Sequence, residues 1–282
     1  MKTSSSVGSP YSTEERLPQA NLQEFLRAKS ILWLLVRREF RSRYAGSNLG
    51  VFWNIIHPIV LVGIYVLIFS TIMAGQTGGG STLDYAVHLT SGIIPWLVFS
   101  EILSRCTTSL VDNASFLQKI ALPVEVLHLS VFLNTLIIHT FSFVALAGFL
   151  LVVGYDLPIR FLWVFPLTLL LALVALGLGL LLSVLHLVLR DVGQLVGIGL
   201  QFMFWLTPII YPFSLMPEFV QTILRYNPLL PYISLSQYCF GAQNAATEFL
   251  ISAQLIFILP FLTISAGILF LRKHRTDLLD LL

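Results

Sequence analysis

The sequence predicts an all-α membrane protein that crosses the bilayer several times. Of its 282 residues, 56% are hydrophobic and only 11% are charged, and the mean hydropathy is +0.86. A soluble domain carries roughly 25% charged residues, so this composition excludes an ordinary soluble protein. Six apolar stretches reach the roughly 20 helical residues that a bilayer core requires. They lie at about 51–74, 91–111, 128–154, 161–187, 193–211 and 249–271.

Two segments are expected before the first span. Residues 1–21 are rich in Ser, Pro and charge, which is typical of a disordered tail. They contain no apolar run followed by a small-residue cleavage site, so no cleaved signal peptide is expected. In residues 22–44, apolar side chains recur at three- and four-residue steps opposite Arg and Lys. This pattern predicts an amphipathic helix on the inner membrane surface, and a soluble helix packed on another subunit is the alternative.

The distribution of basic residues predicts the orientation of the chain. Six spans put both termini on one side, and of the 16 Lys and Arg residues only Arg160 and Arg225 fall on the other side. Because positive charge accumulates in cytoplasmic loops, both termini are expected in the cytoplasm. The transmembrane domain would then cover residues 45–271, and residues 272–282 would form a cytoplasmic tail.

Two connections between spans carry helical patterns of their own. Residues 112–128 contain an Asn that can begin a helix, a short amphipathic run and Pro123, which together predict a brief cytoplasmic helix and a turn. Residues 212–247 are too apolar for an ordinary external loop, and Pro217, Pro228 and Pro231 divide them into two helical pieces. We expect these pieces to dip back into the membrane as re-entrant helices, shielded by protein.

The sequence contains no motif for nucleotide or metal chemistry. It lacks GxxxxGK[ST] and any Gly-Lys pair, so an ATP bound through a P-loop would belong to another chain. Its six His residues lack the spacing or the acidic second ligands of a metal site, and no metal is predicted. Cys106 and Cys239 are expected near opposite membrane faces, so no disulfide is predicted. No Ser-His-Asp or paired-carboxylate arrangement supports an enzyme, and no nucleic-acid partner is expected.

Charged and aromatic residues inside the predicted spans are the candidate functional groups. Glu101 and Arg105 lie four residues apart on one helical face of the second span. Charged residues inside a membrane span indicate either a functional role or an ion pair whose two members only neutralise each other. Aromatic rings offer apolar faces to sugars, although contact with lipid would explain them as well. The aromatic candidates are Trp96 and Phe99 in the second span and Phe202, Phe204, Trp205 and Tyr211 in the fifth.

Three segments of the chain resemble the ABC-2 type permeases that export polysaccharides, a family that includes O-antigen, capsule and teichoic acid exporters. They are LVRREFRSRYAGSNLGVFWNIIHP at the first span, SGIIPWLVFSEILSRCTTSLVDNASFLQKIALPVEVL across the second, and FWLTPIIYPFSLMPEFVQTILRYNPLLPYI near the end. They occur in order and are specific to the family, but not to one glycan. The N-terminal tail looks longer than is usual in the family.

The resemblance implies a homodimer of six-span permeases with two ATPase subunits beneath it. The complex would move a lipid-linked polysaccharide, such as O-antigen or capsule, outward across a bacterial cytoplasmic (inner) membrane. The ATPase chains would bind ATP and Mg, and this chain would carry no cofactor. The loop that docks into the ATPase maps to Asn113, Phe116, Leu117, Gln118 and Lys119.

Two further roles follow from the resemblance. The basic residues of the amphipathic helix would suit a phosphate or pyrophosphate group on the lipid carrier, namely Arg37, Arg38, Arg41 and Arg43. The re-entrant pieces would form an external gate. Aromatic side chains along the channel would give sliding contacts to sugars, and the candidates are Trp96, Phe99, Phe202, Trp205 and Tyr211.

Other functions fit parts of the same pattern. The nearest are a teichoic acid exporter and an ABC-2 exporter of a smaller hydrophobic compound. A membrane-embedded glycosyl- or acyltransferase acting on the same lipid carriers would require a convergent acid or His site and activity without ATP. A non-catalytic membrane scaffold would not depend on an ATPase partner.

Overall fold

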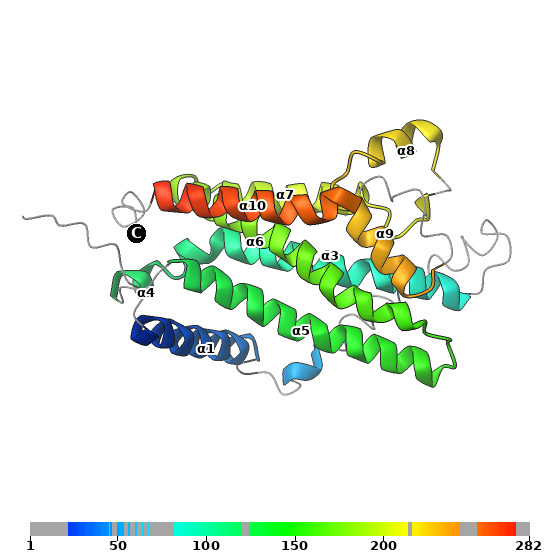
Figure 1. The fold of residues 1–282 in the computed structure, drawn as a ribbon, viewed down its shortest axis with the longest axis horizontal. Helices are drawn as coiled ribbons and strands as arrows, with labels where there is room; N and C mark the ends of the chain where they lie inside the picture. Colours follow the sequence, from blue (N-terminus) through cyan, green and yellow to red (C-terminus); the bar gives the residue numbers. More distant parts are fainter. Residues whose placement is uncertain are drawn as a thin grey trace, which may run out of the picture.

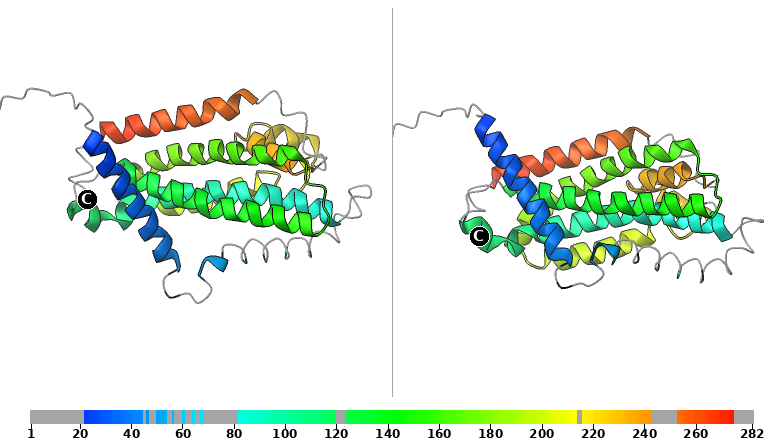
Figure 2. Two further views of the ribbon diagram at one scale, coloured as in Figure 1. Left: turned by 60° about the horizontal axis from the view of Figure 1, so that its bottom comes forward. Right: turned by 90° about the horizontal axis from the view of Figure 1, so that it is seen from below.

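The computed structural model describes residues 22–44, 82–119, 124–213, 216–242 and 253–274, with scattered positions between 46 and 67. All regular secondary structure in these residues is helical, as predicted. The expected tail at 1–21, most of the expected first span at 51–74 and residues 275–282 lie outside them. The long helices form one elongated bundle (Figure 1), and α1 (Leu22–Tyr44) runs obliquely across it near one end, as Figure 2 shows.

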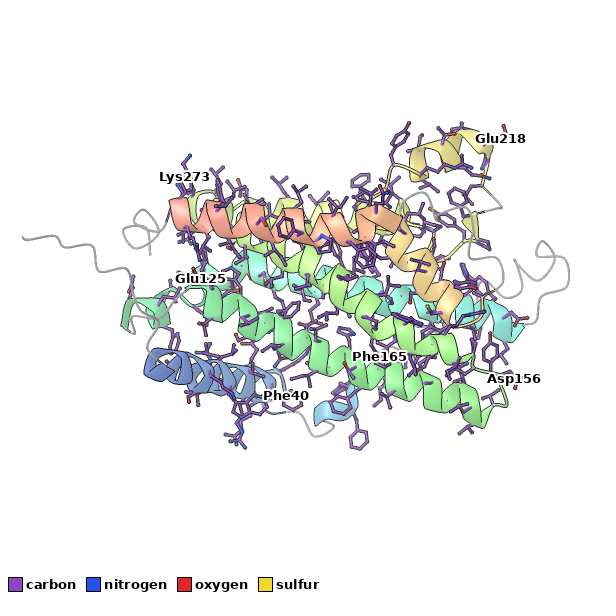
Figure 3. All side chains as sticks on the ribbon, viewed as in Figure 1. Phe40, Glu125, Asp156, Phe165, Glu218 and Lys273 are labelled. Carbon is purple, nitrogen blue, oxygen red and sulfur yellow. The ribbon has the colours of Figure 1, made fainter. Side chains whose placement is uncertain are left out.

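Four helical segments among the described residues are long and apolar enough to cross a membrane. They are α3 (Thr82–Asp112), α5 (Val124–Val152), α6 (Val164–Val188) with the short helix η2 (Ile159–Trp163) before it, and α10 (Ala253–Lys273). They correspond to the second, third, fourth and sixth predicted spans. Glu125 and Lys273 lie at one end of the bundle, and Asp156 and Glu218 lie at the other (Figure 3).

The helix α3 begins nine residues before the predicted span and continues through Pro95. A proline inside a helix leaves the carbonyl four residues earlier, here that of Ser91, without its usual donor. In this structure the hydroxyl of Ser236 donates to the Ser91 carbonyl at 2.6 Å. The donor comes from α9 (Leu230–Cys239), so a neighbouring helix satisfies the backbone group that the proline frees.

Replacing Ser236 by alanine is expected to lower the thermal unfolding temperature of the purified protein by about 2–4 °C. The substitution leaves the buried Ser91 carbonyl without a donor, which costs roughly 1 kcal/mol or more. Ser234 is also buried in α9 and makes no such contact, so Ser234→Ala is the matched control. Equal effects of the two alanine substitutions would contradict this account.

The helix α7 (Val192–Trp205) is shorter than the fifth predicted span at 193–211. Its 14 residues rise about 21 Å at 1.5 Å per residue, whereas the bilayer core is about 30 Å thick. After the helix ends, the side chain of Asn227 satisfies two polar groups that follow it. The Asn227 amide donates to the Leu206 carbonyl at 3.0 Å and to the Thr207 hydroxyl at 2.8 Å.

Two short helices follow α7, in the region where the prolines predict two helical pieces. The helix α9 packs into the bundle with most of its side chains buried, and its Tyr232 hydroxyl donates to the Ile256 carbonyl at 2.9 Å. The helix α8 (Glu218–Leu224) projects from the end of the bundle (Figure 1). That these helices lie within the membrane remains a prediction.

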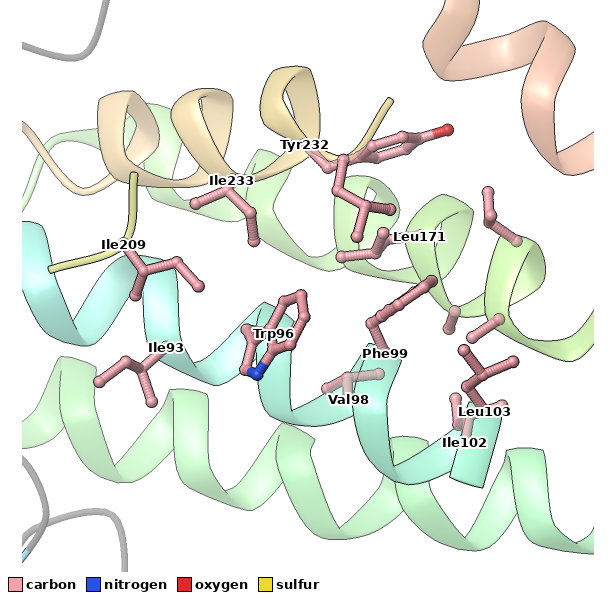
Figure 4. Packing of buried hydrophobic residues seen from close by; sticks show 14 of the residues in the cluster. Ile93, Trp96, Val98, Phe99, Ile102, Leu103, Leu171, Ile209, Tyr232 and Ile233 are labelled. Atoms are coloured by element: carbon pink, nitrogen blue, oxygen red, sulfur yellow. The ribbon is translucent and has the colours of Figure 1, made fainter. Parts of the chain in front are cut away.

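The core of the bundle lies around α3, between α6 and α9. A continuous cluster of buried side chains joins these helices (Figure 4). It includes Ile93, Trp96, Phe99 and Ile102 of α3, Leu171 of α6 and Ile233 of α9.

Glycines bring α6 close to two neighbouring helices. A Cβ atom on Gly177 would lie 2.4 Å from the backbone carbonyl carbon of Thr263 in α10. A Cβ atom on Gly179 would lie 2.5 Å from the Cβ of Cys106 in α3. Such distances are far below van der Waals contact, so both positions require the absence of a side chain. Small residues at membrane helix interfaces allow this close approach of backbones.

Candidate functional site

The helix α1 has the same bounds as the predicted amphipathic helix and packs on α5. Leu35 and Val36 are buried on its inner face, and the amide of Asn134 in α5 donates to the Val36 carbonyl at 3.2 Å. Its outer face exposes apolar and basic side chains together, namely Trp33, Leu34, Arg37 and Arg41. An exposed surface of this composition suits the interface between lipid headgroups and acyl chains.

The predicted pair of Glu101 and Arg105 belongs to a larger polar junction. Arg105 Nη1 donates to Glu101 Oε1 at 3.1 Å within α3, as the four-residue spacing predicts. The same carboxylate accepts hydrogen bonds from Arg43 of α1 at 2.6 and 3.2 Å. Arg105 also forms a salt bridge with Glu39 of α1. Glu101 and Arg105 therefore pair with each other and also connect α3 to α1.

The helix α5 completes this junction from a third side. The hydroxyl of Thr135 lies 3.3 Å from Glu101 Oε1, and His139 Nε2 lies 3.1 Å from Glu101 Oε2. The Glu101 side chain is only 16% exposed. A carboxylate at this depth requires several partners, because an unpaired charge among apolar helices is costly.

The segment predicted to dock into an ATPase contains α4 (Ala114–Lys119), which directly follows Asn113 at the same end of the bundle as α1 (Figure 1). The guanidinium of Arg38 in α1 donates to Asn113 Oδ1 at 2.7 Å and lies 4.9 Å from the centre of the Phe116 ring. The cation–π contact and the hydrogen bond fix α1 to this segment.

The predicted docking residues therefore differ in their surroundings. Leu117 packs against the cluster of Leu110, Val124 and Leu127, whereas the side chain of Gln118 is exposed. The side chain of Lys119 lies outside the described part of the chain. The four basic residues assigned to a lipid carrier are all exposed, and two of them, Arg38 and Arg43, also contact other parts of the protein.

A polar cavity of about 470 Å³ opens between α1, α3, α4 and α5. Its wall combines two guanidinium groups, two carboxylates, several hydroxyls and one aromatic ring. The polar residues that line it include Arg38, Glu39, Arg105, Thr108, Ser109 and Asp112. This composition suits a polar ligand that carries both hydroxyl and anionic groups.

The predicted channel aromatics fall into two groups. Trp96 and Phe99 are buried in the core, and the Trp96 ring contacts that of Phe204 with centroids 5.7 Å apart. Phe202 and Trp205 instead project from α7 with 67% and 55% of their surface exposed. Tyr211 is half-buried, and its hydroxyl donates to the Trp205 carbonyl. Of the predicted channel aromatics, Phe202 and Trp205 of α7 are therefore the two that are open to a passing ligand or to another subunit.

The other end of the bundle contains a polar contact that the sequence did not indicate. Arg160 in η2 donates to the Tyr238 carbonyl at 2.9 Å, and its guanidinium lies 4.2 Å from the centre of the Tyr238 ring. The hydroxyl of Tyr155 donates to the Phe240 carbonyl at 3.3 Å. Burial, and secondly the charge of Asp84, raise the pKa of Tyr155, so this hydroxyl stays protonated and able to donate. The one sequence feature that pointed to this contact was that Arg160 is one of the two basic residues predicted on the non-cytoplasmic side of the membrane.

Comparisons with known proteins agree on one family. Residues 31–241 match the family model described as ABC-2 type transporter, from α1 to the residues just after α9. The chain is 28% identical over 204 residues to the O-antigen export system permease protein RfbA of Klebsiella pneumoniae, which covers 72% of this chain and 77% of that protein. The O-antigen export system permease protein RfbA of Myxococcus xanthus is 28% identical over 225 residues, covering 78% and 83%. The polysialic acid transport protein KpsM of Escherichia coli is 25% identical over 213 residues, covering 72% and 78%. Together with the apolar helices, these matches identify a multi-pass membrane protein.

Proposed function

The chain belongs to the ABC-2 type transporter family, and from this premise we propose that it is the channel-forming membrane subunit of a polysaccharide exporter. The substrate is a lipid-linked polysaccharide of the O-antigen or capsular type, carried across a bacterial cytoplasmic membrane. The observation that carries the proposal is the similarity to two O-antigen export permeases and one polysialic acid transport protein over about three quarters of the chain.

In this proposal the energy comes from partner chains. Two permease subunits form the channel, and two ATPase subunits that bind ATP and Mg lie beneath them, while the permease itself binds no cofactor. The ATPase docks on α4 and the adjoining end of α1, and both termini face the cytoplasm. Support comes from the direct contact between α1 and this segment through Arg38, Asn113 and Phe116.

The exposed surface of α4 offers a direct test of ATPase docking. Gln118→Glu is expected to reduce the amount of ATPase that co-purifies with the tagged permease in mild detergent, because it adds a negative charge to the docking surface without disturbing the core. Thr222→Glu adds the same charge to α8 at the opposite end of the bundle and is the matched control. ATP hydrolysis by the eluate measures the captured partner.

Export itself is tested in cells that lack this chain. Loss of surface polysaccharide with accumulation of its lipid-linked form inside the cell, restored by the wild-type chain, is the expected result. A purified chain that modifies a lipid-linked sugar in the absence of ATP would instead identify a membrane-embedded transferase. Stimulation of ATP hydrolysis by small hydrophobic compounds but not by lipid-linked glycan would identify the smaller-substrate exporter.

A further inference from the structure

Two Glu/Arg pairs with the same spacing meet between α1 and α3. The first helix carries Glu39 and Arg43, and the second carries Glu101 and Arg105, each pair four residues apart. Each carboxylate contacts the guanidinium of the other helix, since Arg43 binds Glu101 and Arg105 binds Glu39. This crossed arrangement fixes the direction as well as the position of α1. If α1 ran in the opposite direction, Glu39 would face Glu101 and Arg43 would face Arg105.

The same four side chains have alternative partners on their own helices. Glutamate and arginine at i and i+4 can pair on one helix, and Arg105 already contacts Glu101 in this way at 3.1 Å. If α1 separates from α3, each glutamate can bind the arginine of its own helix. Thr135 and His139 remain beside Glu101, because they belong to α5. Separation therefore leaves no isolated charge, which is the state that would be costly near the membrane.

We propose that Glu39, Arg43, Glu101 and Arg105 form a reversible charge clasp that holds α1 against α3 and releases it during transport. The release step rests on the proposed export function. In this structure the clasp is closed. Glu39 and Arg105 also line the polar cavity of about 470 Å³, so opening the clasp would widen that cavity toward the face now covered by α1. The clasp acts together with the packing of α1 on α5 and the contact of Arg38 with Asn113 and Phe116 to position α1, and through it access to the cavity.

Charge reversal tests the clasp without removing the pairs within each helix. One variant reverses α1 (Glu39→Arg with Arg43→Glu), a second reverses α3 (Glu101→Arg with Arg105→Glu), and a third combines all four substitutions. Reversal of one helix sets like charges against each other, whereas the combined variant restores opposite charges. Thr135 and His139 can accept hydrogen bonds from a guanidinium placed at position 101.

The measurement is the labelling rate of a thiol placed under α1. Leu35→Cys is introduced into protein with Cys106→Ala and Cys239→Ala, because Leu35 is 3% exposed in the closed state. A bulky, water-soluble maleimide is expected to label position 35 at least about tenfold faster in either single-helix reversal than in the original or combined charge arrangement. Leu34→Cys, at a position that is 64% exposed, should label at one rate in every background.

Two outcomes would overturn the clasp. One is unchanged protection of position 35 when a single helix is reversed, and the other is failure of the combined variant to restore protection. This assay uses purified full-length protein and needs no transport. A chain that shows the expected labelling pattern but exports no polysaccharide would therefore contradict the proposed function and leave the clasp intact.

Release during transport needs a second experiment. Glu39→Cys with Arg105→Cys allows a short reducible linker to join α1 to α3 permanently, while Arg43 can still bind Glu101. Export driven by the ATPase partner should stop after linkage and return after the linker is reduced. Export at an unchanged rate in fully linked protein would show that α1 does not have to move, and would overturn the release step.

Discussion

Glu101→Ala is expected to lower the free energy of unfolding by about 3 kcal/mol, a cost typical of removing one partner from a buried ionic group. The Glu101 carboxylate accepts hydrogen bonds from Arg43 and Arg105 and lies beside His139. Its removal leaves two guanidiniums that share the single carboxylate of Glu39. Thermal unfolding of the purified protein in detergent measures the loss, and Glu218→Ala, at an exposed acid of α8, is the control.

A paired substitution separates loss of charge balance from loss of volume. Glu101→Met combined with Arg43→Met removes one charge of each sign and keeps the bridge between Arg105 and Glu39. Since an ion pair can be replaced by apolar side chains of similar volume at little cost, the double variant should be more stable than Glu101→Met alone, which has the same side chain at position 101. A double variant that is no more stable than Glu101→Met would show that the two charges are not coupled.

Gly177→Ala is expected to lower the thermal unfolding temperature by about 2–12 °C, since overpacking costs roughly 1–3 kcal/mol. The added methyl group would lie between 2.4 and 2.7 Å from three backbone atoms of Thr263 and Ile264, which can move only if α10 moves as a whole. Helix α10 would have to separate from α6 and lose its contacts along the interface. Circular dichroism on heating measures the shift.

Gly148→Ala in α5 is the matched control for this substitution. A Cβ atom at Gly148 meets nothing within 4 Å, so alanine there should leave stability unchanged or raise it by up to about 1 kcal/mol. The two variants add the same methyl group to a helical glycine and differ only in what it meets. Equal stability of both proteins would show that the close approach of α6 and α10 does not contribute to folding.

Hydropathy and local spacing predicted much of the fold. Long apolar runs indicated the spans, alternating basic and apolar residues indicated α1 from 22 to 44, and prolines indicated the division into α8 and α9. These signals are local in the sequence. The partners of Glu101 and Ser91 are not, because Arg43 lies 58 positions from Glu101 and Ser236 lies 145 positions from Ser91. The spacing of apolar residues along the sequence cannot reveal contacts between such distant positions. The continuation of α3 through Pro95 depends on one of these contacts, the hydrogen bond from Ser236 to Ser91.

The aromatic candidates show a second reason why the site could not be predicted. In a soluble protein, an apolar side chain implies burial, but a membrane protein also presents apolar side chains to lipid or to another subunit. Trp96 is 6% exposed and Phe202 is 67% exposed, although both lie in apolar helices. The sequence shows which residues are aromatic. The packing of the helices determines which of these aromatics lie in the core and which lie on the surface.

The close approach of α6 to both neighbours limits where the molecule can deform. Because α6 lies against the backbone of α10 at Gly177 and against the Cβ atom of Cys106 in α3 at Gly179, sliding of α3, α6 and α10 past one another would cause steric clashes, and we expect them to move as a single rigid body. Any alternation between inward-facing and outward-facing states must then be taken up at the periphery of that body. Among the long described helices, α1, α5 and α7 make no glycine contact as close as those at Gly177 and Gly179, so we expect the moving parts of the bundle among these three.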